Sequence, residues 1–237
     1  MIKALLIVPA NNTTMEPEIL AHCREFSRLF VARVPRPART LAREDLPAYG
    51  EATQAAVAPY LAEKPDIVIY GCTAAGFLGG PEGNAVMTQA LAARFGVPVV
   101  STAAAMGECL RFSGASRVAM VTPYLPAVND GLKAWLARLD IGVTVLDSFL
   151  CQTTDALGRV TADEVREKAL ATMTPDSDAM FIACSQLPTL EVLPGLRAVF
   201  RRPVWSSIQG TAWCALRALG LDADRLDGRS PEVSRAA

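Results

Sequence analysis

Apolar and polar residues form two kinds of pattern along this chain. Unbroken apolar and β-branched runs, such as 66–71 (DIVIYG) and 117–122 (RVAMVT), are typical of strands that are buried on both faces of a sheet. Between such runs, as in segment 16–28, apolar residues recur at the spacing of one helix face. The pattern therefore predicts strands and helices in alternation, the arrangement of parallel sheets covered by helices.

The predicted elements divide evenly between the two halves of the chain. The expected strands cover segments 3–8, 29–34, 66–71, 96–101, 117–122, 142–147, 178–184 and 203–207. The expected helices cover segments 16–28, 51–63, 82–95, 102–112, 126–139, 161–172, 189–200 and 208–219. Each half would thus supply the strands of one four-stranded sheet.

An internal repeat supports this division. KALLIVPA is similar to RVAMVTPY, DIVIYGCTAAG to DAMFIACSQLP, and GVPVVSTAAA to RRPVWSSIQG, in the same order and at nearly one spacing. Such order argues for duplication. We predict an α/β fold of two pseudo-symmetric lobes, each a four-stranded parallel sheet flanked by helices, with the active site in the interlobe cleft. The first lobe would hold 1–113 plus 208–237, and the second 114–207.

Composition excludes several classes of protein. Of 237 residues, 51% are hydrophobic and 20% charged, which excludes a disordered chain. The 23 basic and 24 acidic residues leave no basic surplus, so we expect no nucleic-acid partner. No apolar run approaches the ~18–20 residues of a membrane span, so we expect no membrane partner. The 6 cysteines, with no sign of a secretory leader, favour reduced thiols and a cytoplasmic location.

The candidate chemistry lies at the carboxyl ends of the strands, where open α/β sheets bind their ligands. A cysteine follows a matched strand in each half, Cys72 and Cys184, and each precedes a hydroxyl residue and an expected helix start. A helix N-terminus would favour the thiolate. The neighbouring loops are rich in Asn, Ser and Thr and almost free of charge. They predict a pocket that binds a small carboxylate through hydrogen bonds, without Lys or Arg.

Other residues have simpler interpretations. We expect four cysteines to be buried by packing alone: Cys23, Cys109, Cys151 and Cys214. The chain has no CxxC pair, and its one histidine, His22, is expected on a helix face away from the loops, so we expect neither a metal site nor a Cys-His pair. Segment 11–14 could serve only to cap the helix that follows, and Tyr124 could be a core aromatic residue.

Four segments resemble the signature segments of maleate cis–trans isomerases: IVPANNTTME, YGCTAAG, VTPY and ACSQLPT. These enzymes belong to the aspartate/glutamate racemase superfamily, as does arylmalonate decarboxylase. The resemblance covers 7–220 and implies that Cys72 is the nucleophile or base and Cys184 the acid or base on the opposite face. It also implies that Asn12 binds a substrate carboxylate, and it matches Tyr124 to the family's tyrosine. One departure is Thr154, in a stretch where maleate isomerases usually carry another substrate-binding asparagine.

The resemblance implies an isomerase that converts maleate, or a close small dicarboxylate, to fumarate without a cofactor. Cys72 would attack the alkene and Cys184 would protonate the neighbouring carbon. The resulting aci-carboxylate would be stabilised by Asn12, Tyr124 and the backbone N–H groups after the two cysteines, at Thr73, Ala74, Ser185 and Gln186. A homo-oligomer, dimer or larger, is expected from the family. Three alternatives stay open: a cofactor-independent racemase, an arylmalonate-type decarboxylase, and a non-catalytic protein that senses a small acid.

Overall fold

The computed structural model describes residues 1–36, 38–39 and 41–229, and its strands form two four-stranded parallel sheets. The first has the order β2-β1-β3-β4, with strands β1 (Ile2–Pro9), β2 (Phe26–Val34), β3 (Ile67–Tyr70) and β4 (Val99–Ser101). The second has the order β6-β5-β7-β8, with strands β5 (Arg117–Thr122), β6 (Gly142–Ser148), β7 (Ala179–Ile182) and β8 (Val204–Ser206). Because the order is the same in both sheets, the predicted pair of like lobes is confirmed.

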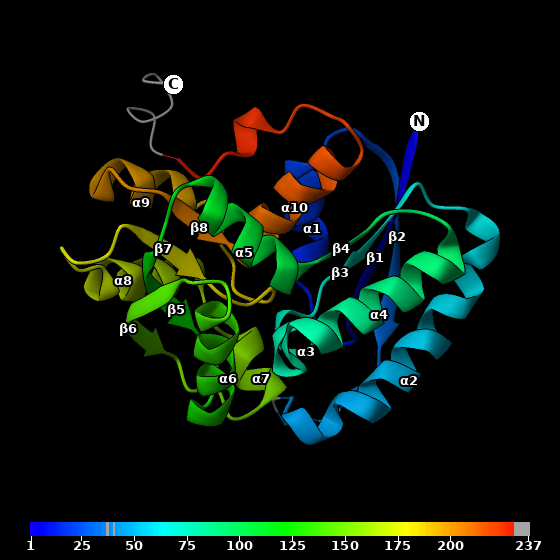
Figure 1. The fold of residues 1–237 in the computed structure, drawn as a ribbon, viewed down its shortest axis with the longest axis horizontal. Helices are drawn as coiled ribbons and strands as arrows, with labels where there is room; N and C mark the ends of the chain where they lie inside the picture. The colour runs from blue at the N-terminus through cyan, green and yellow to red at the C-terminus, as the bar shows by residue number, and fades with distance from the viewer. Residues whose placement is uncertain (37, 40, 230–237) are drawn as a thin grey trace.

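Helices cover both sheets and also fill the space between them. They are α1 (Met15–His22), α2 (Leu46–Val57), α3 (Thr73–Leu78), α4 (Gly80–Phe95), α5 (Thr102–Phe112), α6 (Pro126–Ala137), α7 (Thr154–Gly158), α8 (Ala162–Thr172), α9 (Leu193–Phe200) and α10 (Ser207–Ala218). In Figure 1, α2 and α4 lie outside the first sheet, α8 and α9 lie outside the second, and α5 packs against α10 between the lobes. Within the described residues, every helix falls short of the length and apolarity that a membrane span needs.

The central strands form the cores of the two lobes. Every residue of β3 and of β7 is buried, as their unbroken apolar runs predict. Strand β6 lies at a sheet edge and alternates between exposed and half-buried positions along its first half. The buried strands hold their carboxyl ends in fixed positions, and the loops that follow them carry the candidate chemistry.

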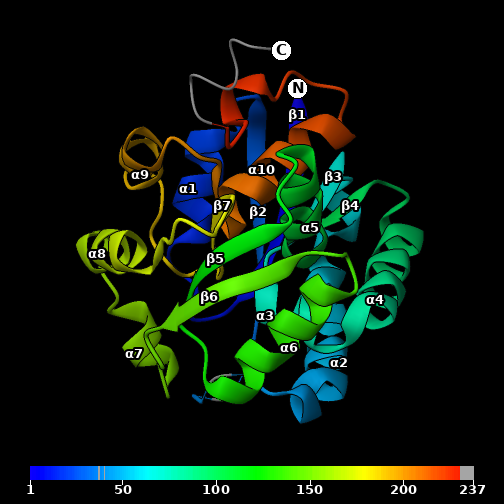
Figure 2. The same cartoon turned by 60° about the vertical axis from the view of Figure 1, so that its left-hand side comes forward.

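Helix α10 follows the last strand of the second sheet but packs against α1 and α5 of the first lobe (Figure 2). This packing supports the predicted lobes of 1–113 plus 208–237 and 114–207, which we retain as a proposal. Residues 230–237 lie outside the described part of the chain.

Several predicted helix boundaries were wrong. The helix expected over 16–28 ends at His22, where Cys23 donates the last helical hydrogen bond, and β2 begins at Phe26. The helix expected over 51–63 begins at Leu46 and changes to a 3₁₀ turn from Ala58, next to a proline. The short helix α7 was not expected, and α3, whose start after Cys72 was expected, ends at Leu78 after six residues.

Candidate active site

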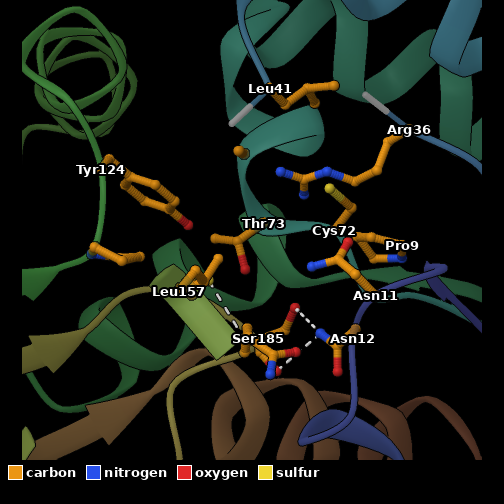
Figure 3. A pocket seen from close by; sticks show the side chains of 14 residues that line it. Pro9, Asn11, Asn12, Arg36, Leu41, Cys72, Thr73, Tyr124, Leu157 and Ser185 are labelled. Carbon is orange, nitrogen blue, oxygen red and sulfur yellow. Dashed lines mark hydrogen bonds between the residues drawn. The ribbon is translucent and has the colours of Figure 1, made fainter. Parts of the chain in front are cut away.

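One pocket opens where the loops after β1, β3, β5 and β7 meet, and it encloses about 480 Å³ including its open mouth. Residues of both lobes line it, which confirms the interlobe position. All the residues predicted for the site are among them: Asn12, Cys72, Thr73, Ala74, Tyr124, Cys184, Ser185 and Gln186. Six further residues were not part of that prediction: Pro9, Asn11, Arg36, Leu41, Pro123 and Leu157. Figure 3 shows this arrangement from close by.

Cys72 lies directly after β3 and is the N-cap residue of α3, which brings its thiol to the pocket from the first lobe. Burial raises the pKa of this thiol. Three groups act in the opposite direction and favour the thiolate: in decreasing order, the charge of Arg36, the backbone N–H of Ala75 and the hydroxyl of Tyr49. The buried Cys72 thiol therefore has several groups that stabilise its anion.

Cys184 faces the same pocket from the second lobe, with a backbone φ of 144° that residues other than glycine rarely adopt. Its N–H donates to Ser207 Oγ at 3.0 Å, and its sulfur accepts from the N–H of Gln186 at 3.4 Å. Burial raises its pKa to about 11, against the lowering effects of that N–H and of the Tyr124 hydroxyl. At neutral pH this residue is a thiol and can donate a proton.

The expectation that helix N-termini favour both thiolates needs two corrections. Cys184 is followed by a turn, with the Leu187 N–H donating to its carbonyl oxygen at 3.3 Å, and α9 begins only at Leu193. In addition, the pKa of both cysteines is raised, because burial outweighs the N–H groups that point at the sulfurs. Ser207 helps to hold the two cysteine loops together, since its Oγ also accepts from Thr73 Oγ1 at 3.2 Å.

Tyr124 lies after β5, opposite Cys72 in Figure 3, with its hydroxyl turned toward Thr73. Its pKa is raised well above the usual value, first by burial and then by the neighbouring Cys184 and Cys72. Its ring packs edge-on against Phe77 at 5.7 Å. Among the described residues the hydroxyl has no hydrogen-bond partner of normal geometry, so a neutral O–H is free to donate to a bound anion.

Hydrogen bonds join the two lobes at the floor of the pocket. Asn12 Nδ2 donates to the carbonyl oxygen and the Oγ of Ser185 at 3.1 and 3.2 Å. Ser185 Oγ in turn donates to the carbonyl oxygen of Gly71 at 2.5 Å. Thr13 and Gln186 exchange two bonds, at 3.0 and 3.1 Å. The side chains of Ser185 and Gln186 thus hold the lobes together, which leaves substrate contacts to their backbone.

Asn12 also caps the first helix. Its Oδ1 accepts from the N–H groups of Thr14 and Met15 at 3.1 and 2.9 Å. The capping alternative raised for segment 11–14 is therefore part of the structure. That Asn12 binds a substrate carboxylate stays a prediction, because both polar atoms of its side chain already have partners.

The expected absence of charge from the pocket was wrong. Arg36, two residues beyond β2, lines the pocket next to Leu41, and its charge lowers the pKa of Cys72 and of Cys184. The sequence pattern does not indicate that this residue lines the pocket, because it lies in a proline-rich segment that marks only the end of a predicted strand. Thr154, the point of departure from maleate isomerases, is buried and uses its N–H to bond the carbonyl oxygen of Ala38 at 2.8 Å.

The remaining candidates lie away from the pocket. All six cysteines are free and buried, so packing accounts for Cys23, Cys109, Cys151 and Cys214 as predicted. His22 is buried at the end of α1 and does not line the pocket. Across the described ranges, His, Cys, Asp and Glu side chains nowhere gather in a group of three that could hold a metal ion. The chemistry available to the pocket is therefore that of two thiols, a tyrosine hydroxyl, backbone N–H groups and one guanidinium.

Comparison with known proteins agrees with this chemistry. A maleate isomerase from Nocardia farcinica is 29% identical over 229 residues, which cover 91% of this chain and 89% of that protein. The solved structure of the Nocardia farcinica maleate cis–trans isomerase bound to TRIS has a TM-score of 0.89 at 25% identity and covers 100% of both chains. An arylmalonate decarboxylase from Bordetella bronchiseptica is 31% identical over 150 residues, 62% of each chain. The family model for arylmalonate decarboxylase matches residues 40–230, and this chain belongs to that family.

Proposed function

We propose that this protein converts maleate, or a close small dicarboxylate, to fumarate by covalent catalysis with two cysteines. The observation that carries the proposal is that Cys72 and Cys184 line one pocket from opposite lobes. The maleate isomerase relative also matches 91% of the chain, against 62% for the decarboxylase relative. A protein that only sensed a small acid would not need a thiol in each lobe.

In the proposed reaction the two thiols have different roles. The Cys72 thiolate forms a C–S bond to one alkene carbon, and the π electron pair moves into the carboxylate on the other alkene carbon. Cys184 then gives its proton to that second carbon, which leaves a single C–C bond that can rotate. Return of the proton to Cys184 and loss of the C–S bond restore the alkene as fumarate. Every atom and electron is balanced without a cofactor.

The intermediate carries an extra negative charge on one carboxylate. The Tyr124 hydroxyl lies close to Thr73 and has no hydrogen-bond partner of normal geometry among the described residues. The N–H groups of Thr73 and Ala74 begin helix α3 without helical partners. We propose that these groups, with the backbone N–H of Ser185, bind the charged oxygens. One such donor contributes ~3 kcal/mol in comparable oxyanion sites.

Proton NMR of the alkene signals tests the proposal directly. Maleate incubated with the protein at pH 6 to 9 should give fumarate, and Cys72→Ser and Cys184→Ser should each lower the rate by roughly three orders of magnitude or more. Cys109→Ser, a buried cysteine outside the pocket, is the matched control and should keep the rate within about threefold. If no fumarate forms at any of these pH values, the proposal fails.

The decarboxylase and racemase alternatives have distinct signatures. Release of carbon dioxide from a disubstituted malonate, with loss confined to Cys184→Ser, would favour the decarboxylase. Incorporation of solvent deuterium at the α-carbon of an amino acid would favour the racemase. The cytoplasmic location and the homo-oligomer, dimer or larger, stay predictions, and sedimentation velocity tests the second.

A further inference from the structure

The Arg36 guanidinium lies in the pocket without an ion-pair partner among the described residues, although its charge, after the larger effect of Arg39, contributes to the lowered pKa of Asp45. The Nε of Arg36 is buried without a hydrogen-bond partner, and no carboxylate of the described residues forms an ion pair with this guanidinium. Its one hydrogen bond, from Nη2 to the carbonyl oxygen of Arg39, is long at 3.4 Å. A partly buried positive charge without a partner is costly, and the cost falls when an anion binds.

A second polar group nearby is also unsatisfied. The Oδ1 of Asn11 is buried without a partner, and the side chain lines the same pocket. In Figure 3 the Asn11 amide and the Arg36 guanidinium lie on either side of the Cys72 side chain. A primary amide can present its N–H₂ to an anion after a rotation of the side chain. Together the two side chains offer donors to a planar anion next to the first thiol.

Two described residues that follow Arg36 in the chain contact the second lobe. Ala38 accepts the N–H of Thr154 at 2.8 Å, and Arg39 forms an antiparallel bridge with Thr153 in the second lobe. Arg39 also pairs with Asp45 at 2.6 Å. The chain is thus held at Ala38 and Arg39, close to Arg36, which reduces the entropy lost when the guanidinium binds an anion.

We propose that Arg36, assisted by Asn11, binds the carboxylate on the substrate carbon that Cys72 attacks. The inference rests on the proposed function and extends it to a specific subsite. The attacked carbon bears one carboxylate, which must lie next to the Cys72 sulfur when the C–S bond forms. The other carboxylate, which receives the electron pair, lies on the carbon that Cys184 protonates and so belongs with Tyr124. The site thus has two carboxylate subsites, one with a cationic side chain and one with neutral hydrogen-bond donors.

Two consequences follow for the reaction. Arg36 holds the half of the adduct that is bonded to Cys72, so rotation about the new single bond moves the other half. Arg36 also compensates the negative charge that the substrate brings toward the thiolate. The preferred substrate class is a dianion with carboxylates on adjacent carbons, because a monoanion of the same length can fill only one of the two subsites.

Binding of unreactive acids tests this without relying on turnover. Isothermal titration compares succinate with butyrate, a monoanion of the same chain length, on the wild-type protein and on Arg36→Met, Arg36→Lys and Arg43→Met. The wild-type protein should prefer succinate, because butyrate fills only one subsite, and Arg36→Met should weaken succinate about 10- to 100-fold. Arg36→Lys should retain part of the succinate affinity, because the charge remains and the bidentate geometry is lost. Arg43 is exposed on the same segment and serves as the matched control.

The outcomes separate this inference from the proposed function. An unchanged succinate affinity in Arg36→Met, in a protein with a wild-type melting temperature, overturns the subsite, as does failure of the wild-type protein to prefer succinate. An equal loss of succinate affinity in Arg43→Met also counts against the Arg36 subsite, because the effect would then be one of general electrostatics. If the wild-type protein makes no fumarate but shows the expected preference, the isomerase proposal fails and the dicarboxylate subsite stands.

Discussion

At the scale of single residues, the two thiols have surroundings of the same kind. Each thiolate is favoured by one backbone N–H and one tyrosine hydroxyl. These come from Ala75 and Tyr49 for Cys72, and from Gln186 and Tyr124 for Cys184. The two thiols differ in the effect of Arg36. Among the groups that lower the pKa, its charge has the largest effect on Cys72 and the smallest on Cys184. This asymmetry supports attack by Cys72 and protonation by Cys184.

Tyr49 gives the first prediction. It is buried on α2, has no hydrogen-bond partner of normal geometry within the described residues, and lowers the pKa of Cys72. Tyr49→Phe should therefore raise the pKa of that thiol, move the rising limb of the kcat/KM profile to higher pH, and lower kcat/KM at pH 7 by about 10-fold. The measurement is maleate turnover across pH.

Tyr60→Phe is the control for this change. The Tyr60 hydroxyl donates to the carbonyl oxygen of Val31 at 2.7 Å, away from the pocket, so its loss should leave the position of the pH profile unchanged. A Tyr49→Phe profile that overlays the wild-type profile would show that the hydroxyl does not act on the thiol.

At the scale of elements, the junction between β3 and α3 depends on close packing. A Cβ at Gly71 would lie 2.9 Å from the carbonyl oxygen of Ile7, which already accepts the Gly71 N–H at 2.7 Å. Backbone atoms cannot give way as a flexible side chain can. The glycine therefore lets β3 end against β1 and places Cys72 at the pocket.

Gly71→Ala should destabilise the fold by about 1–3 kcal/mol and lower maleate turnover as well, because the added methyl group displaces the residue before the thiol. Gly83→Ala is the matched control. It lies in α4 with nothing within 4 Å of the added Cβ, and should be neutral or stabilise by up to about 1 kcal/mol. Urea denaturation measures both. Equal effects of the two changes would contradict the packing argument.

The sequence was most informative where one physical effect dominates. Apolar runs identified the strands to within a few residues, most clearly for β3 and β7, which are buried on both faces. Helices were less predictable, because α3 and α7, with 6 and 5 residues, are too short to repeat the helical period. In the pocket, the positions of Cys72 and Cys184 could be predicted from the repeat. The position of Arg36 could not, because it depends on tertiary contacts with the other lobe that no local pattern encodes.

At the scale of the whole molecule, buried polar groups link the lobes beneath the pocket. Glu18 on α1 accepts from the N–H and Oγ of Thr189 in the second lobe at 2.7 and 2.9 Å, and burial raises its pKa. One turn further along α1, His22 is buried with an unpartnered Nε2. Burial, and then the charges of Arg197 and Arg225, lower the pKa of His22 to about 4.

His22 makes stability depend on pH. Between pH 4 and 6.5 the unfolded chain binds a proton at this residue that the folded chain does not, so stability falls as the pH falls. From pH 6.5 to 5 this contribution amounts to a loss of about 1.5 kcal/mol. Urea denaturation at both pH values should show His22→Gln losing less stability than the wild-type protein by about that amount. The difference between the two proteins cancels the opposite contribution of Glu18, and parallel losses would contradict the assignment.

The repeated strand order carries a consequence for how such a site can change. If each lobe descends from one ancestral unit, the two sulfurs began as equals, each with its own N–H and hydroxyl. The loop that carries Arg36 then decides which sulfur adds to carbon and which supplies hydrogen. The polarity of the reaction, and with it the choice among related acids, can evolve through a few positions of one connecting segment while the paired sulfurs stay untouched.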